Sequence, residues 1–248
     1  MNQSAYERGN YGIDAPLVIR NLLIAGIASM LAGVVLNRIL ASRQSLIATI
    51  LLIWGLLAGA SMVSAAALMI WSSKVGKLQL RERLIDSLNL HGFEIVLDVG
   101  CGRGLLLNAA ARGLTTGRAI GIDLWQNIDQ SGNQPEMTLM NAQKEGVLNR
   151  VEVKTGDMRE LPSEDQTVDV VVSSLAIHNI PDKDGRVKAV QEIARVLRPN
   201  GEIAILDFQR TEEYVQTLRE LGWHEVKLSG LQFQMFPPVK VVAGKKPS

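Results

Sequence analysis

The chain of 248 residues carries 26 basic and 25 acidic side chains, a formal net charge of +1. This balance predicts no nucleic-acid partner, because nucleic-acid binding generally needs a clustered basic surface. A single cysteine, Cys101, excludes a disulfide framework within the chain. The three histidines are scattered without the spacing of a metal site, so we expect no bound metal.

Two long uncharged stretches lie in the first third of the chain. Seventeen residues separate Arg20 from Arg38, and thirty separate Arg43 from Lys74. A helix of about 20 apolar residues crosses the roughly 30 Å hydrocarbon core of a bilayer. The pattern therefore predicts a transmembrane helix hairpin over residues 21–71. A pair of buried helices in a soluble protein is the alternative, and a cleaved signal peptide is disfavoured because a second, longer stretch follows at once.

Small residues recur every four positions in both stretches, at Ala25, Ser29 and Gly33 and at Gly55 and Gly59. Such stripes let two helix backbones approach closely in lipid. They predict that the two helices pack on each other, the alternative being that they only reflect the high alanine and glycine content of membrane helices.

Basic residues near the ends of the stretches predict the orientation of the hairpin. Two arginines, Arg38 and Arg43, lie in the turn. Six basic residues lie on the other side: Arg8, Arg20, Lys74, Lys77, Arg81 and Arg83. We therefore expect residues 1–20 and everything after the hairpin to be cytoplasmic, with the hairpin in the plasma membrane. Residues 72–90 are expected to be a linker and an amphipathic helix with Leu84, Ile85 and Leu88 on one face.

Strand-like and helix-like segments alternate after this point. Apolar strand patterns occur at residues 94–100, 117–123, 150–157, 167–175, 202–208, 224–230 and 239–246. Helical patterns separate the first six, whereas the last two follow each other without a helix and should pair antiparallel. This alternation predicts an α/β domain over residues 91–248, a doubly wound, mostly parallel seven-stranded sheet.

The stretch VLDVGCGRGLLL, Val96–Leu107, places Gly100, Gly102 and Gly104 between the first strand and its helix. Ligands of such sheets bind beyond the carboxyl ends of the strands. Glycines there let a ligand reach main-chain N–H groups at a helix N-terminus. A dinucleotide fingerprint would need a further glycine where Leu105 stands, which disfavours a nicotinamide-dependent oxidoreductase.

The G-x-G-x-G turn, the preceding VLDV and the acid of GIDLW, 19 residues after Gly104, closely resemble the class I S-adenosylmethionine-dependent methyltransferases. The resemblance extends over roughly Arg81 to Lys246 and includes GDMRELP and ARVLRPNGEIAILDF. It implies a Rossmann-like methyltransferase fold, S-adenosyl-L-methionine as the cofactor and methyl transfer as the reaction.

The resemblance also implies the contacts of the cofactor. The glycines would cradle its methionine part, Asp98 would support its amino group, and Asp123 would accept the ribose hydroxyls. Asp157 would accept from the adenine amino group, with Met158 against the ring. The full set of expected cofactor-binding residues is Asp98, Gly100, Gly102, Gly104, Asp123, Leu124, Asp157, Met158 and Ser173. Trp125 is expected to pack on the adenine or, alternatively, on its own loop.

The segment SSLAIHNIPD follows the fourth strand, where the acceptor of such enzymes should lie. It lacks the Asn/Asp-Pro-Pro-aromatic tetrad of methyltransferases that modify amide or ring nitrogens of proteins and nucleic acids. It more nearly resembles the small-molecule branch, which includes quinone and sterol methyltransferases. Arsenite methylation is disfavoured because it needs several cysteines. His178 is the candidate catalytic base, since its ordinary pKa lies near 6.5; the alternative is that it only lines the pocket.

Two functional hypotheses remain. The first is a membrane-anchored methyltransferase that acts on a small-molecule or lipid acceptor. The second is a non-catalytic S-adenosylmethionine-binding sensor that signals through the membrane hairpin. Turnover distinguishes them, because the sensor would bind the cofactor without consuming it.

Overall fold

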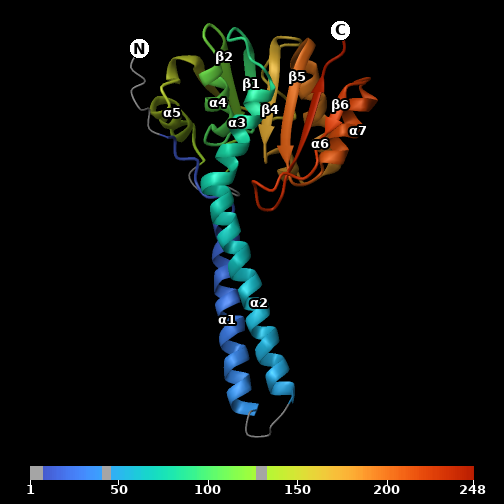
Figure 1. The fold of residues 1–248 in the computed structure, drawn as a ribbon. Coiled ribbons are helices and arrows are strands. Elements are labelled where there is room, and N and C mark those ends of the chain that lie inside the picture. Colours follow the sequence, from blue (N-terminus) through green and yellow to red (C-terminus); the bar gives the residue numbers. More distant parts are fainter. Residues whose placement is uncertain (1–7, 41–45, 127–132) are drawn as a thin grey trace.

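The computed structural model describes residues 8–40, 46–126 and 133–248. Figure 1 shows an α/β domain from which a long helical hairpin projects. The turn of the hairpin, with Arg43, and the middle of the segment that follows Trp125 lie outside the described residues.

The hairpin consists of α1 (Pro16–Leu40) and α2 (Leu46–Trp71), which lie side by side along their length (Figure 1). The polypeptide continues through a π-helical turn, Ser72–Gly76, directly into α3 (Lys77–Ser87). The segment predicted as a linker is therefore helical from its first residue. By length and composition, both apolar helices are able to cross a membrane.

Glycines bring the two hairpin helices into close contact. A Cβ atom added to Gly59 would lie 2.5 Å from the carbonyl oxygen of Gly26, and one added to Gly55 would lie 2.9 Å from the Cα atom of Gly33. The hydroxyl of Ser29 donates a hydrogen bond of 3.2 Å to the carbonyl of Gly55. The predicted stripe is wrong at one position, because Ala25 is exposed and Gly26 is buried instead.

The seven strands form one sheet in the order β3-β2-β1-β4-β5-β7-β6. Their bounds are β1 Ile95–Val99, β2 Arg118–Asp123, β3 Val151–Thr155, β4 Val168–Ser174, β5 Leu197–Asp207, β6 Val226–Leu228 and β7 Lys240–Lys245. The first five are parallel, and β7 pairs antiparallel with both β5 and β6. The predicted doubly wound, mostly parallel seven-stranded sheet is confirmed. Chain order reverses between β1 and β4, which makes their carboxyl ends the switch point of the sheet.

Two apolar cores cover the two faces of the sheet. The helices that cover the sheet are α3, α4 (Leu105–Gly113), α5 (Pro135–Lys144), α6 (Lys183–Val196) and α7 (Thr211–Glu220). One core joins side chains of α6 and α7, such as Ile193 and Leu218, to the sheet. The other includes Leu84 of α3 and Leu107 of α4. The amphipathic helix that follows the hairpin is thus part of the packing of the domain.

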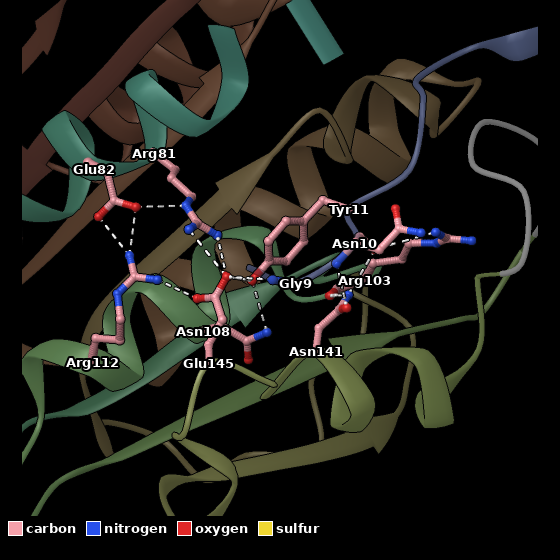
Figure 2. A network of polar contacts seen from close by, with 10 residues as sticks. All are labelled: Gly9, Asn10, Tyr11, Arg81, Glu82, Arg103, Asn108, Arg112, Asn141 and Glu145. Atoms are coloured by element: carbon pink, nitrogen blue, oxygen red, sulfur yellow. Dashed lines mark hydrogen bonds and ion pairs between the residues drawn. The ribbon is translucent and has the colours of Figure 1, made fainter. Parts of the chain in front are cut away.

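Residues 9–14, which we call the N-terminal strap, cross the domain before α1 begins (Figure 2). The buried hydroxyl of Tyr11 donates a hydrogen bond of 2.7 Å to Glu145 and accepts one of 3.2 Å from Asn108. The main chain of Asn10 exchanges hydrogen bonds with the side chain of Asn141. The strap therefore fixes the start of α1 to the domain.

Candidate active site

A cavity of about 620 Å³ opens at the carboxyl ends of β1, β2 and β4. Its volume lies within the range of about 300–1,000 Å³ that is usual for small-molecule sites. Residues predicted from the sequence form much of its wall: Asp98, Gly100, Gly102, Asp123, Leu124, Asp157, Met158 and His178. Gly104 and Ser173 do not line it.

The glycine turn joins β1 to α4. Gly100 has φ +74°, and a Cβ atom added to it would lie 2.3 Å from the Cβ atom of Ala176, so a side chain is excluded there. Gly104 precedes α4 in the left-handed conformation, with φ +81°. Its position suits the entry of the chain into the helix, while Gly100 and Gly102 present backbone to the cavity.

Asp98 lies near the end of β1 and is only 2% exposed. One carboxylate oxygen accepts a hydrogen bond of 2.9 Å from the N–H of Leu107. Burial raises the pKa of Asp98 to about 7; the N–H of Leu107 opposes this shift and the negative charge of Asp123 adds to it. A cationic ligand group beside this carboxyl would favour its ionised form.

Asp123 ends β2 and holds the neighbouring loops around its carboxylate. It accepts hydrogen bonds from the N–H of Gly102 at 2.8 Å, the N–H of Trp125 at 2.7 Å and the side-chain amide of Asn133 at 3.1 Å. The Trp125 side chain donates to the hydroxyl of Thr155 at 2.8 Å and does not line the cavity. The ring is therefore directed to the end of β3, a placement that neither of the two expectations for Trp125 gave.

Asp157 and Met158 follow β3 and both face the cavity. The guanidinium of Arg159 donates to both carboxylate oxygens of Asp157 and lowers the pKa of that carboxyl. Ser173 in β4 is fully buried, and its hydroxyl donates a hydrogen bond of 2.7 Å to the carbonyl of Val99. The neighbouring Ser174 lines the cavity in its place.

His178 lies in a 3₁₀ turn, Ile177–Asn179, directly after β4. Its side chain is 14% exposed, and Nδ1 lies 2.8 Å from Oδ1 of the buried Asp207, outside the direction of a regular hydrogen bond. Asp207 also accepts from the hydroxyl of Tyr214 at 3.1 Å. The Phe208 ring and the imidazole form a T-shaped pair, with 4.6 Å between the ring centroids.

Sequence reasoning missed Asp207, although it ends β5 as Asp123 ends β2, and this position was an available signal. It also missed the part of the cavity wall that the hairpin supplies, including Val18 and Met69. No signal in the sequence placed these apolar side chains near the glycine turn. Within the described ranges, no group of three or more His, Cys, Asp or Glu side chains is placed to hold a metal ion.

The chain is similar to known methyltransferases. Residues 97–205 match a family model described as a methyltransferase domain. A demethylmenaquinone methyltransferase of Lactobacillus johnsonii is 30% identical over 158 residues, which cover 63% of this chain and 57% of the relative. A sterol 4-C-methyltransferase of Caenorhabditis elegans is 30% identical over 142 residues, covering 57% of this chain and 38% of the relative. The chain thus spans about half the length of these curated relatives.

Among solved structures, the [4+2]-cyclase SpnF has a similar fold, with a TM-score of 0.56 and 19% sequence identity. The match covers 68% of this chain and 80% of SpnF. At this identity the likeness concerns the fold alone. Residues 97–205 thus match the methyltransferase family model, and the sheet with its switch-point cavity has the class I fold of the S-adenosylmethionine-dependent methyltransferases.

Proposed function

We propose that this protein is an S-adenosylmethionine-dependent methyltransferase that acts on a small-molecule or lipid acceptor. The observation that carries the proposal is the placement of Asp98, Asp123 and Asp157 around one cavity, at or just beyond the carboxyl ends of three adjacent strands. Three acids and a glycine turn suit a ligand that presents an ammonium, ribose hydroxyls and an adenine amino group. The residues present therefore fit the cofactor that the fold implies.

The residues of the chain contribute mainly by alignment. S-Adenosylmethionine, when bound, supplies a methyl group on a positively charged sulfur. Asp123 would accept from the ribose hydroxyls, while Asp98 and the glycine turn would hold the methionine part. Holding two reactants in line contributes up to about 7–11 kcal/mol to lowering a barrier.

His178 is the proposed general base for an acceptor whose reacting atom carries a proton that must be removed. Asp207 faces Nδ1 of the imidazole, which favours the tautomer with the proton on that nitrogen. Nε2 is then the nitrogen that accepts a proton. Positioned general bases accelerate reactions by about 10²–10⁴-fold. This contribution is smaller than that of alignment, so alignment stays the main source of the rate.

Membrane anchoring is a separate part of the proposal. The apolar windows of α1 and α2 are only 17% and 11% buried within the structure, which is unlike the core helices of a soluble protein. With six basic residues on the domain side and two in the turn, the hairpin would lie in the plasma membrane with the domain in the cytoplasm. A sensor that signals through the hairpin is the second candidate, favoured by the unbroken passage of α2 into α3.

Binding of the cofactor tests the assignment of Asp123. Replacing Asp123 with Asn or Ala removes charge-assisted hydrogen bonds worth about 1.5–3 kcal/mol each, so calorimetry should show at least about tenfold weaker S-adenosylmethionine binding. Asp86→Ala, at an exposed acid of α3, is the control and should bind like the wild type. Wild-type affinity in a folded Asp123→Asn protein, or NADH binding in place of S-adenosylmethionine, would contradict the proposal.

Substitution of His178 tests the role of a base. His178→Ala should lower turnover by about 10²-fold or more while cofactor affinity stays nearly constant. The wild-type rate should rise with pH, because only the neutral ring accepts a proton. If His178 only lines the pocket, the His178→Ala variant should show a modest loss of both cofactor affinity and turnover. The pH dependence of its rate should then be the same as that of the wild type.

A further inference from the structure

The wall of the cavity has a second, apolar part that the methyltransferase strands do not supply. It consists of Val18 from α1, Met69 from α2, and Met235, Phe236, Pro237 and Val239 from the segment between β6 and β7. The acids that suit the cofactor lie on the strands instead. One cavity thus joins a polar wall built by the sheet to an apolar wall that lies between the segment before β7 and the root of the hairpin, by which we mean residues 14–18 and 69–77. The root also places the polar side chains of Asp14, Ser72 and Lys77 on the cavity.

The root of the hairpin is fixed against the domain from two sides. The N–H of Phe236 donates a hydrogen bond of 2.9 Å to the hydroxyl of Ser72. The carbonyl oxygen of Gln234 lies only 1.5 Å from where a Cβ atom of Gly76 would be, so this approach requires glycine. On the other side, Lys77 donates to the carbonyl of Tyr11 and forms a 2.9 Å ion pair with Asp14. The apolar wall is therefore a built part of the cavity.

Apolar surface continues from the cavity along the hairpin. Figure 1 shows that the hairpin leaves the domain below the carboxyl ends of the parallel strands, where the cavity opens. Val18, Trp71 and Val75 are exposed there, and Leu231 and Phe233 are exposed on the segment that precedes Met235. Exposed apolar side chains gathered at one end of a domain are typical of a ligand or membrane interface.

We infer that the root of the hairpin is part of the acceptor site, and that the acceptor is a bilayer-dissolved molecule with an extended hydrocarbon part. The inference rests on the proposed function, since it takes the polar wall to be occupied by the cofactor. The hydrocarbon part lies against Val18, Met69 and Phe236, and the reacting group lies toward His178. A wall formed in part by two apolar helices suits a hydrocarbon chain better than a water-soluble acceptor.

Thiol protection tests the location of the acceptor without requiring turnover. The native Cys101 also lines the cavity but is buried, and the wild type measures its background labelling. The additional labelling of Met69→Cys in the full chain therefore reports on position 69. The chain is placed in phosphatidylcholine nanodiscs that contain a sterol, an isoprenoid-tailed naphthoquinone or a long-chain fatty acid. At about ten times its Kd, a bound probe should slow maleimide labelling about tenfold. Leu68→Cys, one position earlier, exposed and off the cavity, is the matched control.

A second pair of variants tests the same wall by filling it. In the Met69→Cys background, Val18→Trp should abolish protection by the probe, whereas Leu17→Trp, exposed and off the cavity, should leave it unchanged. No protection by any of the three probes, or equal protection of Leu68→Cys, would overturn the inference. Calorimetry with S-adenosylmethionine separates the two proposals. Cofactor binding without protection contradicts the acceptor site alone, and protection without cofactor binding contradicts the proposed function alone.

Discussion

Asp98 places a carboxyl group that is only 2% exposed in the wall of the cavity, and its ionisation therefore affects the stability of the domain. Its pKa rises from an ordinary 3.8 to about 7 in the folded chain, mainly because of burial. Between these pH values the folded state keeps a proton that the unfolded state loses. Stability contributed by the neutral carboxyl is thus complete below pH 4 and is lost as the pH rises to about 7.

Asp98→Asn should remove this pH dependence. The amide stays neutral, and its oxygen still accepts from the N–H of Leu107. We expect the wild-type free energy of unfolding to fall relative to that of the variant by about 3 kcal/mol between pH 4 and 7. Denaturant titrations of both proteins at several pH values measure the difference, with Asp86→Asn as an exposed control. Parallel curves for wild type and Asp98→Asn would contradict the shifted pKa.

At the residue scale, the sequence predicted which acids at the ends of strands line the cavity, but it did not predict the direction in which every side chain points. Asp98, Asp123 and Asp157 line the cavity as the sequence predicts. Ser173 does not, because successive strand residues face opposite sides and Ser174 is the one that faces the cavity. Trp125 has φ +59°, and no sequence pattern indicated that this backbone would direct its ring to Thr155.

At the element scale, Glu145 joins three segments that are far apart in the chain (Figure 2). It follows α5, is 5% exposed, and accepts from Tyr11 of the strap, Arg81 of α3 and Arg112 of α4. The guanidinium of Arg81 also lies 4.8 Å from the centroid of the Tyr11 ring. Burial is the main reason that the pKa of Tyr11 is raised, so its hydroxyl keeps the proton that it donates to Glu145.

Glu145→Gln should therefore destabilise the attachment of the strap and α3. Removing the charge of Glu145 leaves Arg81 and Arg112 to share the carboxylate of Glu82, and the loss of a charge from a buried pair costs up to about 3–5 kcal/mol. Glu82→Gln is the matched control, because Glu82 pairs with the same two arginines but its side chain is 48% exposed. An exposed pair contributes about 0–1 kcal/mol. Chemical denaturation in detergent compares the two, and equal losses would argue against a buried role for Glu145.

The strands and helices of the domain follow from periodicity, whereas the strap does not. Alternating apolar patterns predicted all seven strands and the antiparallel pairing of the last two. The contact between Tyr11 and Glu145 spans 134 positions and depends on one hydroxyl and one carboxylate. The helix through Ser72–Gly76 was also missed, because hydropathy changes there while the backbone stays helical.

At the scale of the whole molecule, the dimensions of the hairpin match a bilayer. The 25 residues of α1 extend for about 38 Å at about 1.5 Å per residue, and a hydrocarbon core is roughly 30 Å thick. The strap and α3 hold the base of the hairpin, so the cavity would lie close to the membrane surface. An acceptor would then pass from lipid to the cavity without crossing bulk water.

Labelling of engineered cysteines tests this arrangement and its orientation. Ile39→Cys lies in the last turn of α1, and Figure 1 shows that this end of the hairpin is distant from the domain. Phe93→Cys lies two residues before β1 and is exposed. The wild type is the background control, because Cys101 is buried. If the domain is cytoplasmic, an impermeant maleimide added to intact cells labels Ile39→Cys, and Phe93→Cys reacts only after lysis. The opposite pattern would reverse the orientation inferred from the basic residues. Release of the wild type by alkaline carbonate, with neither variant labelled before lysis, would show that the hairpin does not span, because a spanning pair of helices is extracted only by detergent.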